Sequence, residues 1–243
     1  MRLAVLTAAV FPSEEDARAK LWIFLKSATR AGVPTKDLHL YGMGDRFGGY
    51  RHLKLDTQLP YLLKLIGLGY SHVLYTDGWD AFFTAPLTEI IDKYERMGSP
   101  PMLVSAYTGF ADSTKPDGFG DESEPRRYPH VGGYFAELPV VIDAFERMLQ
   151  LPNQTGDDSF SWRDAWLEGW FRPVLDSKCQ IFQVTDEQCV KVPNNWGVGG
   201  PRVFNMATGS HPCILHLAGG YTDQITGKDD RMIPWAKRLG VIE

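Results

Sequence analysis

The first 107 residues alternate between short hydrophobic runs and longer amphipathic stretches. The hydrophobic runs are rich in Val, Leu and Tyr, which favours strands buried inside a sheet. The amphipathic stretches repeat hydrophobic residues every three or four positions, as expected of helices packed on a sheet. We expect strands at 3–10, 37–41, 72–76 and 102–106, and helices at 13–32, 55–66 and 86–97. Pro60 should kink or shorten the second helix. This alternation predicts an α/β fold with an open, mostly parallel sheet.

The second half of the chain is less regular. Residues 108–130 are rich in Gly, Pro, Asp and Ser without periodicity, so we expect a long loop that covers or forms a binding site. A second irregular stretch covers residues 185–211. The regular elements expected here are strands at 132–135, 181–183 and 213–216, and helices at 138–149 and 158–168. No linker divides the chain, which predicts one domain over residues 1–243.

Composition and charge exclude several classes of protein. The chain has 243 residues, of which 44% are hydrophobic and 23% charged, an ordinary globular composition. The formal net charge of -5 argues against a strongly basic protein bound to nucleic acid or to an anionic membrane. Three cysteines at irregular spacing favour reduced thiols. The hydrophobic start fits a first strand better than a signal peptide, and no run reaches the roughly 20 residues of a membrane span. We therefore expect a cytoplasmic protein with no membrane partner.

The strongest candidate for chemistry is Asp77-x-x-Asp80, which follows the buried strand at 72–76. Ligands of open α/β sheets bind beyond the carboxyl ends of the strands. Two carboxylates placed there repel each other unless a cation lies between them, and a hard divalent cation with phosphate co-ligands fits. His216, at the end of another short strand, is a candidate third ligand, which would favour Mn²⁺ with Mg²⁺ possible. The alternatives are a solvated turn and a histidine of the core.

Two further features suit contact with a ligand. Gly132 and Gly133 precede a strand, where the absence of a Cβ lets the backbone approach a ligand closely; a β-bulge or tight turn is the alternative. Trp79, between the two aspartates, offers an aromatic face to a nucleotide base, against the alternative of a partly buried core residue.

Charged residues give three weaker candidates. Asp157 and Asp158 open a helix, where they either cap it or orient a sugar hydroxyl and accept a proton from an acceptor. Lys54 is either solvated or a contact to phosphate. Arg126 and Arg127, in the long loop, are either solvated or in contact with an anionic donor or acceptor. The sequence contains neither a P-loop nor a His-Glu-x-x-His motif nor a Gly-x-Ser-x-Gly elbow.

Five segments of the sequence are informative because of the order in which they occur. They are the D-x-x-D motif in 75–83, the glycine pair in 131–135, the acidic pair in 156–158, Leu-Asp-Ser-Lys-Cys-Gln-Ile-Phe-Gln at 175–183, and Pro-Cys-Ile-Leu-His at 212–216. Together they resemble the glycosyltransferase domain of the procollagen lysyl hydroxylases and its relatives among collagen, bacterial and viral sugar transferases. No single segment is specific, and the resemblance depends on their order.

The resemblance covers roughly residues 36–220 and implies a GT-A fold, a Rossmann-like sheet flanked by helices. Its nucleotide-binding half would span about 1–107, and a smaller, irregular half at about 108–243 would bind the sugar and acceptor. It implies a metal-dependent transferase that moves a hexose, glucose or galactose, from a UDP-sugar. The implied metal ligands are Asp77, Asp80 and His216, and the implied donor contacts are Lys54, Thr76, Asp77, Trp79, Gly132, Gly133 and Gly219. Asp157 and Asp158 would lie beside the reacting sugar.

The chain departs from this family at two places. Ser159 replaces the usual Gln after the acidic pair, and Leu-Ala-Gly at 217–219 replaces the usual Gly-Asn-Gly. Contacts to the sugar and phosphate are therefore expected to differ. The acceptor hydroxyl would belong to a protein, a glycan or a hydroxymethylated base of viral DNA. A noncatalytic protein that binds nucleotide-sugars or carbohydrates, and a metal-dependent phosphohydrolase, are the alternatives from other classes.

Overall fold

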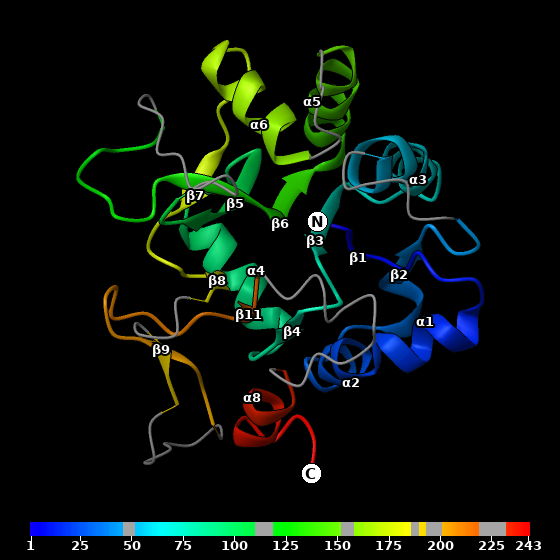
Figure 1. Ribbon diagram of the computed structural model, residues 1–243, viewed down its shortest axis with the longest axis vertical. Coiled ribbons are helices and arrows are strands. Elements are labelled where there is room, and N and C mark those ends of the chain that lie inside the picture. The colour runs from blue at the N-terminus through cyan, green and yellow to red at the C-terminus, as the bar shows by residue number, and fades with distance from the viewer. Residues whose placement is uncertain (46–51, 110–118, 152–157, 186–189, 193–200, 219–231) are drawn as a thin grey trace.

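The computed structural model describes residues 1–45, 52–109, 119–151, 158–185, 190–192, 201–218 and 232–243. Its centre is a six-stranded sheet in the order β2-β1-β3-β6-β5-β7 (Figure 1). The six strands are β1 (Leu3–Ala8), β2 (Leu38–Tyr41), β3 (His72–Thr76), β5 (Met102–Tyr107), β6 (Tyr128–Glu137) and β7 (Val174–Asp176). Only β6 runs antiparallel to its neighbours within this sheet, which confirms the predicted mostly parallel sheet.

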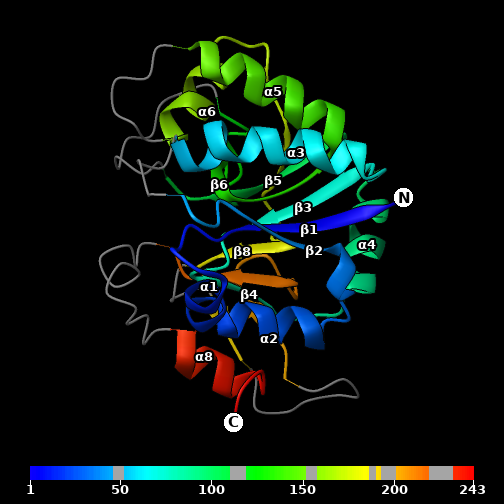
Figure 2. The same ribbon diagram turned by 90° about the vertical axis from the view of Figure 1, so that its right-hand side faces the viewer.

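Helices cover both faces of this sheet (Figure 2). On one face, α3 (Gln58–Gly67), α5 (Leu138–Gln150) and α6 (Asp158–Leu167) bury apolar side chains against the strands. On the other face lie α1 (Glu14–Lys20), α2 (Trp22–Arg30) and α4 (Leu87–Arg96). Residues of α2 and α4 share a second apolar cluster with the strands. The arrangement is that of a GT-A-like α/β fold.

A second, three-stranded sheet lies on the α2 side, in the order β4-β11-β8. It is formed by β4 (Ala81–Phe83), β8 (Phe182–Val184) and β11 (Ile214–His216). The last of these pairs antiparallel with β4 and parallel with β8. This sheet therefore joins the turn after β3 to two distant segments of the second half. The remaining elements include two short strands, β9 (Val190–Lys191) and β10 (Phe204–Asn205), a 3-10 turn at Thr35–Asp37 and a final helix α8 (Met232–Arg238).

The structure corrects two expectations and agrees with a third. The helix predicted at 13–32 is interrupted at the buried residue Leu21 and forms α1 and α2. The α-helix predicted at 55–66 is shortened at its start, as expected from Pro60: α3 begins at Gln58, so that the proline lies in its first turn, and the chain enters α3 through a π-helical turn, His52–Thr57. The loop predicted at 108–130 ends earlier, since β6 begins at Tyr128. None of the described helices is both long and apolar enough to cross a bilayer.

Candidate active site

Asp77, Asp80 and His216 converge on one point. The two aspartates lie in the turn between β3 and β4, and His216 ends β11, the strand paired with β4. One potential ligand atom from each residue lies within 4.8 Å of the other two, and Nε2 of His216 is 3.0 Å from Oδ1 of Asp80. Within the described chain these are the residues that form such a cluster. The predicted ligand set is therefore brought together, although its members are far apart in the sequence.

Backbone hydrogen bonds hold the turn in place. The N–H of Gly78 donates to Oγ1 of Thr7 at 2.7 Å, and the N–H of Asp77 donates to the carbonyl of Gly132 at 3.0 Å. The N–H of Leu217 donates to the carbonyl of Asp80 at 2.8 Å, next to the histidine. The turn is thus tied to β1, β6 and β11 together. The aspartate carboxylates are presented by a backbone that is already ordered.

The charges within this cluster stabilise one another. Burial alone would lower the pKa of His216, but the adjacent Asp80 carboxylate outweighs it, and the pKa is raised. Burial alone would raise the pKa of Asp77, but Lys54 and His216 outweigh it, and the pKa is lowered. Two carboxylates and an imidazole are a donor set that suits Mn²⁺ or Mg²⁺ with phosphate oxygens as further ligands.

Gly132 allows this cluster to form. A Cβ on Gly132 would lie 2.1 Å from Cε1 of His216 and 2.9 Å from Oδ2 of Asp77, so no larger residue fits without displacing them. The pairing of β5 with β6 jumps from Val104–Tyr134 to Ser105–His130, which marks a bulge over the glycine pair. The bulge brings the backbone of β6 against the side chains of the cluster. The alternative of a β-bulge is confirmed, and the approach of this backbone to a bound ligand stays a prediction.

Lys54 supplies a buried positive charge beside the cluster. It lies on the π-helical turn, with Nζ 2.8 Å from Oδ2 of Asp77 and 3.8 Å from Oδ2 of Asp158. Burial would lower the pKa of this amine, but Asp158 and Asp77 outweigh it, and the pKa is raised. Lys54 is therefore charged at neutral pH. Single π-helical turns are frequent at functional sites, because they direct a side chain that a regular helix would point elsewhere.

Tyrosines support the aspartates from the core. The hydroxyl of Tyr75 donates to Oδ1 of Asp77. The ring of Tyr75 stacks on that of Tyr134, with centroids 5.0 Å apart. The hydroxyl of Tyr134 in turn accepts a hydrogen bond from Nε2 of Gln58 at 2.7 Å. This buried network fixes the orientation of Asp77. No pattern in the sequence predicted it, because its members are far apart along the chain.

His130 is a site residue that the sequence reasoning missed. Its ring lies edge-on to that of His216, with centroids 4.8 Å apart, and its Nδ1 accepts the N–H of Gly132 at 3.3 Å. Burial and the adjacent His216 hold its pKa well below the usual range, so the ring is neutral. The residue falls in the predicted loop 108–130, and no periodicity distinguished it there. Its position two residues before the glycine pair was the one available signal.

The other predicted donor contacts lie around the cluster. Trp79 is half-buried in the same turn; its Nε1 donates to the carbonyl of Ala8 at 3.1 Å, and its ring packs on Phe11. Oγ1 of Thr76 is buried and has no hydrogen-bond partner within the described ranges. A Cβ on Gly133 would lie 2.8 Å from the ring of Phe182, so packing between the sheets accounts for this glycine. Their contacts with a nucleotide stay predictions.

Several remaining candidates are placed as follows. Asp158 is buried and is the first residue of α6, as predicted, whereas Asp157 and Gly219 lie outside the described residues. Arg126 is buried and donates to the carbonyl of Val184 at 3.3 Å. Two of the cysteines, Cys179 and Cys213, are buried free thiols.

Comparison with known proteins finds a similar fold and no related sequence. No protein-family model matches the chain, and no curated protein matches it significantly. Among solved structures, the chain is similar to a glycosyltransferase involved in the glycosylation of the major capsid of PBCV-1. The TM-score is 0.57 at 13% sequence identity, over 96% of this chain and 100% of that one. At this identity the likeness concerns the fold, and this chain has the GT-A-like fold of a glycosyltransferase.

Proposed function

We propose that the protein is a metal-dependent glycosyltransferase that moves a hexose, glucose or galactose, from a UDP-sugar to an acceptor hydroxyl. One observation carries the proposal: Asp77, Asp80 and His216 meet at the carboxyl end of β3 in a GT-A-like fold. Open α/β sheets bind their ligands at this edge. The residues that would hold Mn²⁺ or Mg²⁺ are these three.

The chemistry divides between the cation and the protein. When bound, a divalent cation would neutralise the negative charge that builds up on the UDP leaving group. Lys54 is a permanent positive charge at the same place, held by Asp77 and suited to contact a phosphate oxygen. The close approach of Gly132 helps to position His216. These groups favour departure of a diphosphate, because they are ordered before the reaction begins.

Asp158 is proposed to act on the sugar side. Its carboxylate is buried and lies 3.8 Å from Nζ of Lys54, the same amine that contacts Asp77. A carboxylate oxygen there can accept a hydrogen bond from a hydroxyl of the donor sugar or take the proton of the acceptor hydroxyl. In this proposal Asp77 and Asp158 both lie near Lys54 and have different roles. Asp77 acts toward the diphosphate, and Asp158 acts toward the sugar.

The acceptor is proposed to be a hydroxyl on a protein or glycan. The similar solved structure is described as acting in glycosylation of a capsid. The formal charge of -5 also disfavours DNA, whose binding relies on phosphate contacts by basic residues. Glycosylation of a hydroxymethylated DNA base would require retention on DNA at low salt that is lost steeply as salt is added.

The test is UDP release. Wild-type protein with Mn²⁺ is incubated with UDP-glucose or UDP-galactose, first alone and then with candidate acceptors. Asp80→Asn should lower UDP release by about 100-fold or more, the loss typical of a preorganised charge stabiliser. Asp143→Asn is the matched control, because Asp143 is an exposed residue of α5. Wild-type turnover in Asp80→Asn would refute the metal assignment. Nucleotide-sugar binding without UDP release would favour a noncatalytic protein, and phosphate release from simple esters a phosphohydrolase.

A further inference from the structure

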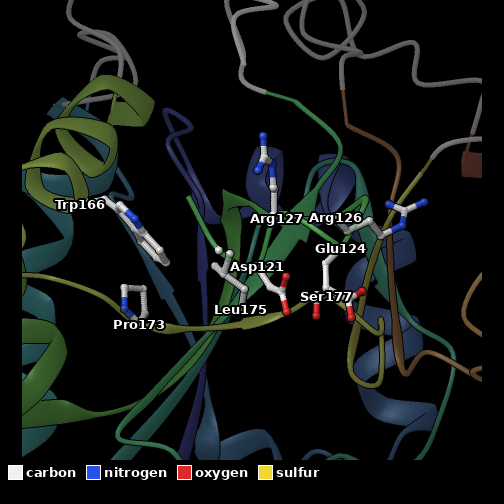
Figure 3. Close-up of a pocket in the computed structure, with 9 residues that line it drawn as sticks. Asp121, Glu124, Arg126, Arg127, Trp166, Pro173, Leu175 and Ser177 are labelled. Atoms are coloured by element: carbon white, nitrogen blue, oxygen red, sulfur yellow. The ribbon is translucent and has the colours of Figure 1, made fainter. Parts of the chain in front are cut away.

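A pocket lies beyond the candidate active site, between β7, α6 and the segment that leads into β6 (Figure 3). Its volume is about 200 Å³. One wall is apolar and is formed by Trp166, Pro173 and Leu175. The opposite side carries the polar groups of Asp121, Glu124, Arg126, Arg127 and Ser177. The proposed function assigns no role to this pocket.

The apolar wall is firmly supported. The ring of Trp166 stacks on that of Phe119, with centroids 5.4 Å apart and planes 23° apart. Phe119 also packs on Tyr128, the first residue of β6, and the three rings form a small buried cluster. The indole is therefore fixed by its neighbours and does not need a ligand to order it. A rigid aromatic wall is a suitable contact for the C–H groups of a sugar ring.

Acidic and basic residues are equal in number on the polar side of the pocket. Its lining includes two acidic residues, Asp121 and Glu124, and two arginines, of which Arg126 donates to the carbonyl of Val184. Arg127 pairs with Glu122 at 3.6 Å, and Lys178 forms a salt bridge with Glu124. A pocket with this balance has no net attraction for an anion such as a phosphate or for a cation. Donors and acceptors side by side suit a neutral ligand with many hydroxyls.

The pocket is linked to the active site through two elements. The side chain of Arg126 reaches from the pocket to the carbonyl of Val184 in β8, and Val184 pairs with His216. Helix α6 carries Asp158 at its first residue and Trp166 near its end. At 1.5 Å per residue the two residues are separated by about 12 Å along the helix. A ligand in the pocket would therefore lie near the active site without occupying it.

We propose that this pocket binds one pyranose unit of an acceptor glycan, away from the hydroxyl that reacts. The ring would lie against Trp166, and its hydroxyls would meet the carboxylates, Arg126 and Ser177. The inference builds on the proposed function and identifies its acceptor as a glycan. An aromatic contact opposite a few polar groups is the usual composition of a small-molecule site.

The probe is a panel of methyl α- and β-pyranosides of glucose, galactose, mannose, fucose and xylose, observed by saturation-transfer NMR on the whole protein. At least one should bind, with a Kd of about 1–10 mM for so small a ligand. Ser177→Tyr, which fills the pocket, should weaken that binding at least about fivefold, and Glu124→Gln should weaken it without adding bulk. The control is Leu167→Tyr on the exposed side of α6. Trp166→Leu is a poorer choice, since the buried indole supports the fold.

Competition distinguishes the pocket from the donor site. Excess UDP with Mn²⁺ should leave the pyranoside signal unchanged, and displacement by UDP would overturn the proposal. So would the absence of binding by every pyranoside, or equal binding in Ser177→Tyr and wild type. UDP binding is measured separately by thermal shift in the same variants. Pyranoside binding without any UDP binding would refute the proposed function and leave the pocket assignment in place. The converse result would refute the pocket assignment alone.

Discussion

Gly132 and His216 are in such close contact that a Cβ on the glycine would lie 2.1 Å from Cε1 of the imidazole. The same Cβ would lie 2.9 Å from Oδ2 of Asp77. A methyl group at this position must therefore displace two of the three predicted metal ligands. The glycine is a requirement of the site and of the bulge in β6 that presents it.

Gly132→Ala is expected to weaken Mn²⁺ binding by about 10–100-fold, the loss typical when a group supporting a metal ligand is changed. Titration calorimetry with Mn²⁺ gives the measurement. The control is Gly67→Ala, where a Cβ would meet nothing within 4 Å. Because Gly67 is the last residue of α3, alanine there should leave the fold intact. Equal Mn²⁺ affinity in Gly132→Ala and wild type would contradict the assignment of His216 as a ligand.

Lys54→Met is expected to destabilise the fold and to raise the KM for the UDP-sugar. The variant leaves the carboxylates of Asp77 and Asp158 without their nearby cation. Removing one partner of a buried charge pair costs about 3–5 kcal/mol, and the partial exposure of Asp77 places this case at or below the lower end. Urea unfolding and donor kinetics measure the two effects. Lys26→Met, at an exposed position of α2, should change neither.

Asp158→Asn is expected to lower kcat by about 100-fold or more while Mn²⁺ affinity stays within a few-fold of wild type. The reason is that Asp158 faces Lys54 and is not part of the ligand cluster. Asp164→Asn, further along α6, should retain wild-type kcat. A parallel loss of Mn²⁺ binding in Asp158→Asn would mean that this carboxylate belongs to the metal site.

Glu89 is expected to make the free energy of unfolding depend on pH. Burial would raise its pKa, but Arg202 and Lys93 outweigh it, and its pKa falls from 4.5 to about 2. A carboxyl group with a lowered pKa stabilises the fold fully above its unfolded pKa. That contribution is lost as the pH falls from about 4.5 toward 2, and at most about 3 kcal/mol is involved. Partial exposure of both partners reduces this figure.

The measurement for Glu89 is urea unfolding of wild type and Glu89→Gln at pH 6 and pH 3. Wild type should be the more stable protein at pH 6, and the difference should shrink at pH 3. An unchanged difference between the two pH values would show that the ion pairs with Arg202 and Lys93 contribute nothing in solution.

Much of the sheet could be predicted because its strands leave a local signal. The runs at 3–8, 72–76 and 102–106 are buried on both faces, so their hydrophobic residues are nearly continuous. The choice of Asp77 and Asp80 as candidate metal ligands followed from a general rule, since both come directly after such a strand. Prediction of His216 also needed the resemblance, because the histidine alone suits a core position equally well.

The missed elements depend on pairing between distant segments. Strands β4 and β7 have three residues each, and their partners are β11 and β5. Three residues are too few for any periodicity to show, and the equally short β8 and β11 were predicted only from their hydrophobic residues. The contact of His130 with His216 arises from the bulge in β6. No local sequence preference predicts this bulge. These features come from tertiary packing, which overrides local propensity.

The position of β11 between β4 and β8 has a consequence for biosynthesis. The aspartates leave the ribosome early, whereas the strand that ends in the histidine follows much later and must insert between two strands that are already made. The cluster of Asp77, Asp80 and His216 is therefore among the last parts of the molecule to form. A truncated nascent chain that ends before β11 would contain all six strands of the main sheet and both aspartates, but it would lack the histidine and so could not assemble the cluster.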